Sequence, residues 1–289
     1  MDRDHPLRRA LPLVLLAGVF FSTLDATAKY LVRDHTLFLV VWARYVGQML
    51  VTTPIAWHRV GPGFWRTSNL RIQLVRSLCL VIATLCFFGG LRYLPLAEAS
   101  AITFLAPMCA IVLSMPVLGE RPTRARWTSA LVGFAGVLVL LRPGSAVFHP
   151  ATGFLVLAAI SNALYQLLTR KLPNDTPHTT LFYSGLVGAA GLSLALPFVD
   201  MPDVVTARDA MFLLVLGLLA GLGHWALIAA FLRAPASLIA PFTYLHMIWA
   251  TFYGFAIFGQ LPDALSAAGM AIIVASGAGL MLHERRRAS

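Results

Sequence analysis

Four charged side chains lie inside long apolar stretches early in the sequence: Asp25, Lys29, Arg44 and Arg76. A charge in the middle of a lipid bilayer costs about 2.5–3.5 kcal/mol on insertion scales, so each one needs a partner or a function. Asp25 and Lys29 are four residues apart and therefore share one face of a helix. Asp25 and Arg44 lie at similar distances from the short polar segment between their stretches. The spacing therefore predicts an Asp25–Arg44 pair.

Two chemistries are open to this pair. It could be a buried salt bridge that fixes how two helices pack. It could instead bind a solute, because the Arg44 guanidinium can hold a carboxylate or phosphate through two parallel hydrogen bonds. Asp25 would then be the counter-ion of Arg44 or a carrier of a proton. Arg76 lies near the end of its stretch, and its long side chain is predicted to reach the membrane surface.

Polar and aromatic side chains also interrupt the apolar stretches of the second half. A single intramembrane His is often only a hydrogen-bonding part of the packing, but two of them favour a binding role. A mostly apolar cavity with a few polar groups suits an amphiphilic solute with a flat apolar part. The predicted binding residues are Asp25, Arg44, Asn162, Tyr165, His224, Trp225, Tyr244 and His246.

Catalytic and metal-binding motifs do not emerge from the sequence. His283-Glu284 is only a fragment of the HExxH zinc motif, and no Walker A glycine loop is present. The three cysteines lie inside apolar stretches and form an odd set, which argues against a disulfide framework. We therefore expect no enzyme activity, no cofactor, no metal site and no ATP-driven pump.

The elements that must position these residues are membrane helices. The chain is 58% hydrophobic and 12% charged, with mean hydropathy +0.78; a soluble domain has about 25% charged residues. About 20 apolar residues cross a bilayer as a helix, and the backbone must be hydrogen-bonded internally there. The sequence thus predicts an all-α integral membrane protein with a lipid bilayer around it. The ten predicted spans are 10–32, 37–57, 71–92, 96–118, 126–142, 153–171, 179–199, 210–232, 236–258 and 265–283.

The positive charges are distributed unevenly about these spans. The net charge of +10 reflects Lys and Arg residues at one set of helix ends. Only Arg33, Arg92, Arg142 and Arg208 lie at the other ends. Cytoplasmic loops carry the excess of Lys and Arg, so both termini are predicted to be cytoplasmic. The basic charge therefore indicates membrane orientation, and nucleic acid is not an expected partner.

The two halves of the chain resemble each other at an offset of 140 residues. Residues 94–122 align with residues 233–262, the second range being given from one residue earlier. The identical pairs are Pro95/Pro235, Thr103/Thr243, Leu105/Leu245, Ala110/Ala250, Gly119/Gly259 and Pro122/Pro262. Each copy holds five predicted helices, and five is odd, so the second copy must have the opposite topology. The prediction is two inverted five-helix repeats, 10–142 and 153–283, an architecture shared by many secondary transporters that work by alternating access.

Several longer segments carry a family resemblance that covers almost the whole chain. They are DATAKYL (25–31), WARYVG (42–47), RYLPLAEASAITFLAPMCAIVLSMPVLGERP (92–122) and GHWALIAAFLRAPASLIAPFTYLHMIWATFYGFAIFGQLPD (223–263). In these segments the sequence resembles the drug/metabolite transporter superfamily, EamA type. The resemblance implies a secondary transporter that moves a small organic metabolite across the bacterial inner membrane.

The resemblance implies a class of substrate and does not identify one compound. The expected substrate is amino-acid-like, or otherwise amphiphilic or aromatic; S-adenosylmethionine or riboflavin, taken up through the same fold, is the alternative. The sequence leaves open whether transport is coupled to an ion or a proton. It also leaves open whether the protein is a monomer or a homodimer. A membrane-embedded enzyme or a structural subunit is the alternative from a different class.

Overall fold

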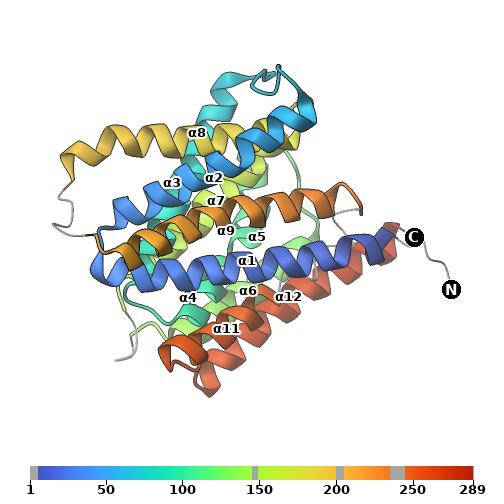
Figure 1. Ribbon diagram of the computed structural model, residues 1–289. Coiled ribbons are helices and arrows are strands. Elements are labelled where there is room, and N and C mark those ends of the chain that lie inside the picture. The colour runs from blue at the N-terminus through green and yellow to red at the C-terminus, as the bar shows by residue number, and fades with distance from the viewer. Residues whose placement is uncertain (1–5, 145–148, 200–204, 235–244, 289) are drawn as a thin grey trace.

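The computed structural model describes residues 6–144, 149–199, 205–234 and 245–288 (Figure 1). In these ranges the regular structure is helical, and eight helical segments are long and apolar enough to cross a membrane. With two further apolar helices, α8 and α11, they match the predicted ten-helix, all-α membrane fold. The helices are α1 (Pro6–Asp34), α2 (Leu37–Val60), α3 (Leu70–Leu91), α4 (Leu96–Thr103), α5 (Ala106–Leu118), α6 (Arg124–Leu141), α7 (Thr152–Arg170), α8 (Pro177–Ala195), α9 (Ala207–Phe231), α11 (Leu245–Phe258) and α12 (Ala264–Ala288).

The helix ends follow from local side-chain chemistry. Asn69, Thr123 and Thr206 each precede a helix, and their side chains accept a hydrogen bond from a backbone N–H of its first turn. Gly119 ends α5 in the left-handed conformation, with φ 71°. The predicted span 96–118 is broken into α4 and α5, because Pro107 has no backbone N–H with which to continue the helical ladder.

The helices pack in matching pairs across the two halves. α1 packs against α9 as α7 packs against α3, and α2 packs against α9 as α8 packs against α3. α1 also contacts α11 as α7 contacts α5, and α6 pairs with α12. The long helices lie side by side in one bundle, with both chain termini at the same end (Figure 1). We call the end that holds Pro6 and Ala288 the terminal face, and the end between α1 and α2 the opposite face.

Two pairs of glycines bring helices of different halves into close contact. A Cβ on Gly47 of α2 would lie 2.4 Å from the Cα of Gly217 on α9. A Cβ on Gly136 of α6 would lie 3.0 Å from the carbonyl oxygen of Gly269 on α12. Small residues of this kind allow backbones to approach closely in a membrane, where the hydrophobic effect does not hold helices together.

The molecule has an apolar surface, and its mostly apolar interior also encloses charged side chains. Large apolar side chains such as Leu50, Leu131 and Leu194 are exposed, as expected for helices in contact with lipid. Arg76 and Lys29, by contrast, are buried. Because the bundle surrounds these charges, the interior is where a polar solute could be bound.

Candidate functional site

A buried contact between the two halves joins two of the predicted binding residues. The Asp25 Oδ2 atom on α1 lies 3.1 Å from the His246 Nε2 atom on α11. Beside it, the Ser22 hydroxyl donates to the His246 carbonyl oxygen at 3.3 Å. The predicted Asp25–Arg44 pair was therefore wrong: the recorded partner of Asp25 is His246. Helix packing explains the difference. α9 contacts both α1 and α2, and α1 makes far more extensive contact with α9 than with α2.

His224, another predicted residue, lies on α9. Its ring meets the Phe21 ring edge-on, with centroids 5.0 Å apart. Its Nδ1 atom is 2.8 Å from the Ala220 carbonyl oxygen. A carbonyl only accepts hydrogen bonds, so Nδ1 carries the proton and a neutral ring would offer Nε2 as an acceptor. Trp225, the next residue, is half-buried.

Arg44 is buried on α2 and incompletely bonded. Its guanidinium carbon lies 4.5 Å from the centroid of the Tyr45 ring. Its Nη1 atom is buried and has no hydrogen-bond partner in the described part of the chain. A buried cation with a free N–H is a candidate reader of a negatively charged group.

Arg76 is placed differently from the prediction. Its side chain does not reach the membrane surface but is 1% exposed, between α3, α7 and α8. Five hydrogen bonds hold the guanidinium, and Tyr165 both accepts one of them and stacks with its ring centroid 4.6 Å from Cζ. The acceptors are Thr169 Oγ1, Gln73 Oε1, the Thr180 carbonyl, Tyr165 Oη and Ser184 Oγ. Burial is tolerated because neutral acceptors replace the water.

This network continues to Asp175 at the terminal face. Gln73, which accepts from Arg76, donates through Nε2 to Asp175 Oδ2 at 2.7 Å. Asp175 also accepts from the Thr67 hydroxyl and from the Ser68 N–H. Burial acts to raise the pKa of Asp175, but these hydrogen bonds outweigh it and bring the pKa below its ordinary value. The first signal of this network in the sequence is the spacing of Gln73 and Arg76, three residues apart on one helix.

Asn162 and Tyr244 complete the predicted set. Asn162 is half-buried on α7, one turn before Tyr165. Tyr244 lies outside the described residues. The structure thus brings Asp25 together with His246, whereas Tyr165 is a partner of Arg76.

Lys29 is buried at the opposite face and stabilises the end of a helix. Its ammonium donates to the Leu91 carbonyl at 3.1 Å and to the Leu94 carbonyl. The last carbonyls of a helix have no partner within the helix, and a cation there also interacts favourably with the helix dipole. Lys29 is therefore a structural cation, although it shares a helix face with Asp25.

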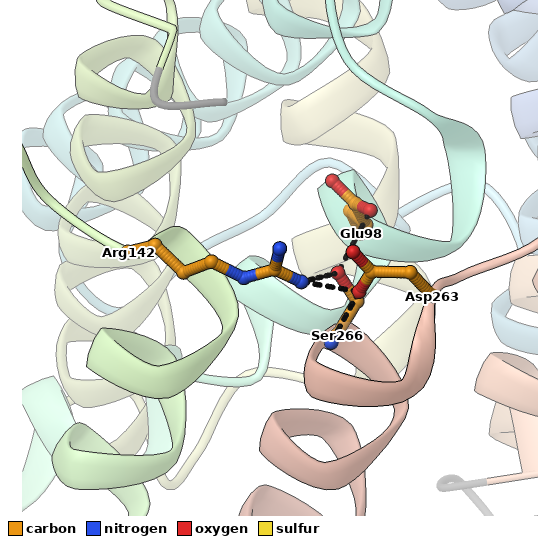
Figure 2. Close-up of polar contacts among 4 residues, drawn as sticks. All are labelled: Glu98, Arg142, Asp263 and Ser266. Atoms are coloured by element: carbon orange, nitrogen blue, oxygen red, sulfur yellow. Dashed lines mark hydrogen bonds and ion pairs between the residues drawn. The ribbon is translucent and has the colours of Figure 1, made fainter. Parts of the chain in front are cut away.

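A second polar cluster at the opposite face was not predicted (Figure 2). Arg142, after α6, pairs with Asp263, before α12. The Ser266 N–H donates to Asp263 at 2.8 Å, and its hydroxyl donates to Glu98 of α4 at 3.0 Å. The hydrogen bonds from Arg142 and Ser266 lower the pKa of Asp263 to about 2. The cluster links three helices, and its signal in the sequence is that Arg142 is one of the few cations at this set of helix ends.

A hollow of about 260 Å³ also opens at this face, between the ends of α1, α2 and α3 and the start of α7. Its lining is mostly apolar but includes Arg92 and Tyr93, and it contains none of the predicted binding residues. The buried charged groups inside the bundle, and not this hollow, are the candidate site.

These features define a class of protein. The chain is all-helical, carries enough apolar helices to cross a membrane many times, and encloses charged side chains between two halves that pack alike. It is a multi-pass membrane protein. A chain of known crystal structure has the same fold, with a TM-score of 0.70 and 22% identity over 96% of this chain and 98% of that one.

Comparison with protein families gives the particular assignment. The model of the EamA-like transporter family matches residues 8–142 and again residues 150–282. The chain belongs to this family, which confirms the resemblance seen in its sequence and points to a transporter rather than an enzyme.

Named relatives cover nearly the full length. An S-adenosylmethionine uptake transporter of Rickettsia prowazekii is 28% identical over 95% of this chain and 93% of its own. A riboflavin transporter of Vibrio cholerae is 30% identical over 99% and 96%. The pseudopaline exporter CntI of Pseudomonas aeruginosa is 26% identical over 93% and 94%.

Proposed function

We propose that this protein is a secondary transporter that moves a small organic metabolite across the bacterial inner membrane by alternating access. The observation that carries the proposal is the Asp25–His246 contact, because it joins a buried carboxylate of the first half to a half-buried imidazole of the second half. Groups contributed by both halves can change their exposure when the halves move relative to each other. The uneven distribution of Lys and Arg supports cytoplasmic termini.

The substrate class follows from the relatives and the interior together. The relatives are named for S-adenosylmethionine, riboflavin and pseudopaline, and they include both an uptake transporter and an exporter. An amino-acid-like, amphiphilic or aromatic metabolite is the proposed substrate, with S-adenosylmethionine or riboflavin itself as the specific alternative. Transport in both directions therefore belongs in the test.

The binding residues of the proposal are those predicted from the sequence, apart from Tyr165, which is a partner of Arg76. They centre on Asp25 and His246. A His in hydrogen-bond contact with a carboxylate can bind a proton, and a proton bound there would offset the negative charge of Asp25. A proton is therefore the coupling ion that this geometry favours. The repeats proposed to move against each other are residues 10–142 and 153–283.

The test is metabolite-resolved uptake and efflux in proteoliposomes, with and without a pH gradient. Asp25→Asn and His246→Gln should each lower transport at least tenfold while the abundance of folded protein stays normal. Tyr253→Phe is the matched control, because it removes the neighbouring α1–α11 hydrogen bond, 2.8 Å from Thr23 to Tyr253, without removing a charge. Wild-type transport by Asp25→Asn and His246→Gln, or an equal loss in Tyr253→Phe, would contradict the proposal.

A further inference from the structure

Unpartnered polar groups are concentrated on one face of α2. Arg44 is 6% exposed with Nη1 unbonded, and Gln48 is fully buried with both amide atoms unbonded in the described structure. The two residues are four apart, so their side chains lie one above the other on the same face. Ser77 of α3 is fully buried, and its hydroxyl likewise lacks a partner among the described residues.

The packing shows where this face points. Gly47 contacts Gly217 of α9, which fixes one side of α2. Tyr45 donates to or accepts from Thr84 of α3 at 3.0 Å, which fixes the other side. Arg44 and Gln48 lie between these two directions on the helix, so their face points into the space between α9 and α3.

Ser77 lies on the same face of α3 as Thr84, two turns closer to the terminal face. α2 and α3 run in opposite directions, and Tyr45 of α2 meets Thr84 of α3. Ser77 therefore lies closer to the terminal face than Gln48 does. The three unbonded groups therefore follow one another from Arg44 toward the terminal face. They form a polar strip on the inner faces of two adjacent helices.

The charges around the strip leave Arg44 uncompensated. Asp25 is bonded to His246, Asp175 to Gln73 and its neighbours, and Glu98 to Ser266. Each of these three carboxylates thus has a recorded partner, and none of those partners is Arg44. A buried charge without a partner is strongly unfavourable, and an external anion would remove that cost.

We propose that Arg44, Gln48 and Ser77 form a binding subsite for a carboxylate on the substrate. The unbonded Nη1 atom of Arg44 can donate to a carboxylate, and the unbonded Gln48 amide N–H adds a further donor. The Gln48 amide oxygen and the Ser77 hydroxyl bind a donor next to that carboxylate. The substrate class is therefore an anionic or zwitterionic metabolite with a donor beside its carboxylate, and this assignment rests on the proposed transporter function.

The test uses a defined mixture of metabolites, half with a carboxylate and half without, offered to proteoliposomes. Wild type should accumulate compounds with a carboxylate. Arg44→Gln and Gln48→Leu should lose this accumulation at least tenfold, with unchanged protein abundance and melting temperature. Arg44→Lys keeps the charge without the planar fork and should retain a part of it. Thr52→Val is the matched control, since Thr52 is buried one turn after Gln48 but its hydroxyl already donates to the Gln48 carbonyl.

Three results would overturn the subsite while leaving the transporter intact. The accumulated compounds could all lack a carboxylate, Arg44→Gln could transport at the wild-type rate, or Arg44→Gln and Gln48→Leu could lose folded protein, which would make the strip structural. Accumulation of no compound by wild type in either direction would overturn the proposed function itself, and the subsite with it.

Discussion

Arg44 and Arg76 are both buried arginines of the first half, yet their surroundings differ. Arg76 makes five hydrogen bonds to neutral groups and stacks on Tyr165. Arg44 stacks on Tyr45 and keeps an unbonded N–H inside the bundle. The first has replaced its water shell with protein, and the second has not. Burial of a charge alone therefore does not separate a structural residue from a binding one; the completeness of its hydrogen bonds does.

The strongest way to break this comparison is to replace each arginine by methionine. Arg76→Met removes five hydrogen bonds and leaves buried hydroxyls with fewer partners, so the free energy of unfolding should fall by about 2–3 kcal/mol. Arg44→Met removes an uncompensated charge and should be neutral or stabilising. Melting temperatures of the purified proteins in one detergent measure both. Equal destabilisation by the two substitutions would show that Arg44 and Arg76 do not differ as structural and binding residues.

A smaller effect is expected when one partner of Arg76 is altered. Tyr165→Phe keeps the aromatic ring under the guanidinium but removes the hydroxyl that accepts from Nη2 at 3.2 Å. The expected loss is about 1 kcal/mol, the net value of one hydrogen bond. Tyr45→Phe is the corresponding change beside Arg44, and it breaks the bond to Thr84 instead. If Tyr165→Phe loses transport with unchanged stability, Tyr165 contacts the substrate and the comparison must be redrawn.

The smallest expected effect is the pH dependence at Asp175. Its folded-state pKa lies below the ordinary value of 3.8, so its hydrogen bonds stabilise the fold fully above about that pH. The stabilisation is lost as the pH falls below 3.8 and through the folded-state pKa. Melting curves between pH 3 and pH 6 should show a decline at the acidic end that is weaker in Asp175→Asn. Parallel curves for the two proteins would show that Asp175 does not hold the Arg76 network.

The fold could be predicted from the sequence because hydrophobic length and chain repetition are properties of long segments. Each apolar stretch is close to the thickness of a bilayer, and the 140-residue offset is visible in the aligned Pro and Gly residues. The break between α4 and α5 was less visible, since Pro107 marks a discontinuity but does not say where the helix resumes.

The site could be predicted only in part, because side-chain partners depend on how helices are arranged around one another. The depth of Asp25 in its helix does not say which neighbour it faces, and the neighbour proved to be His246. Arg76 was predicted to reach the surface because four of its five acceptors come from α7 and α8, about 90–110 residues later in the chain. Gln48 and Ser77 gave no signal, since an uncharged polar residue in a membrane helix is common.

The contact between Gly47 and Gly217 has a mechanical consequence. Two backbones in contact cannot move closer, so the freedom left to α2 and α9 is rotation about the point of contact. Gly47 divides α2 into arms of about 15 and 20 Å, and Gly217 divides α9 into arms of similar length, at 1.5 Å per residue. A fulcrum so near the middle gives the two arms nearly equal leverage. A tilt that separates these helices at one membrane surface would bring them together by a comparable distance at the other.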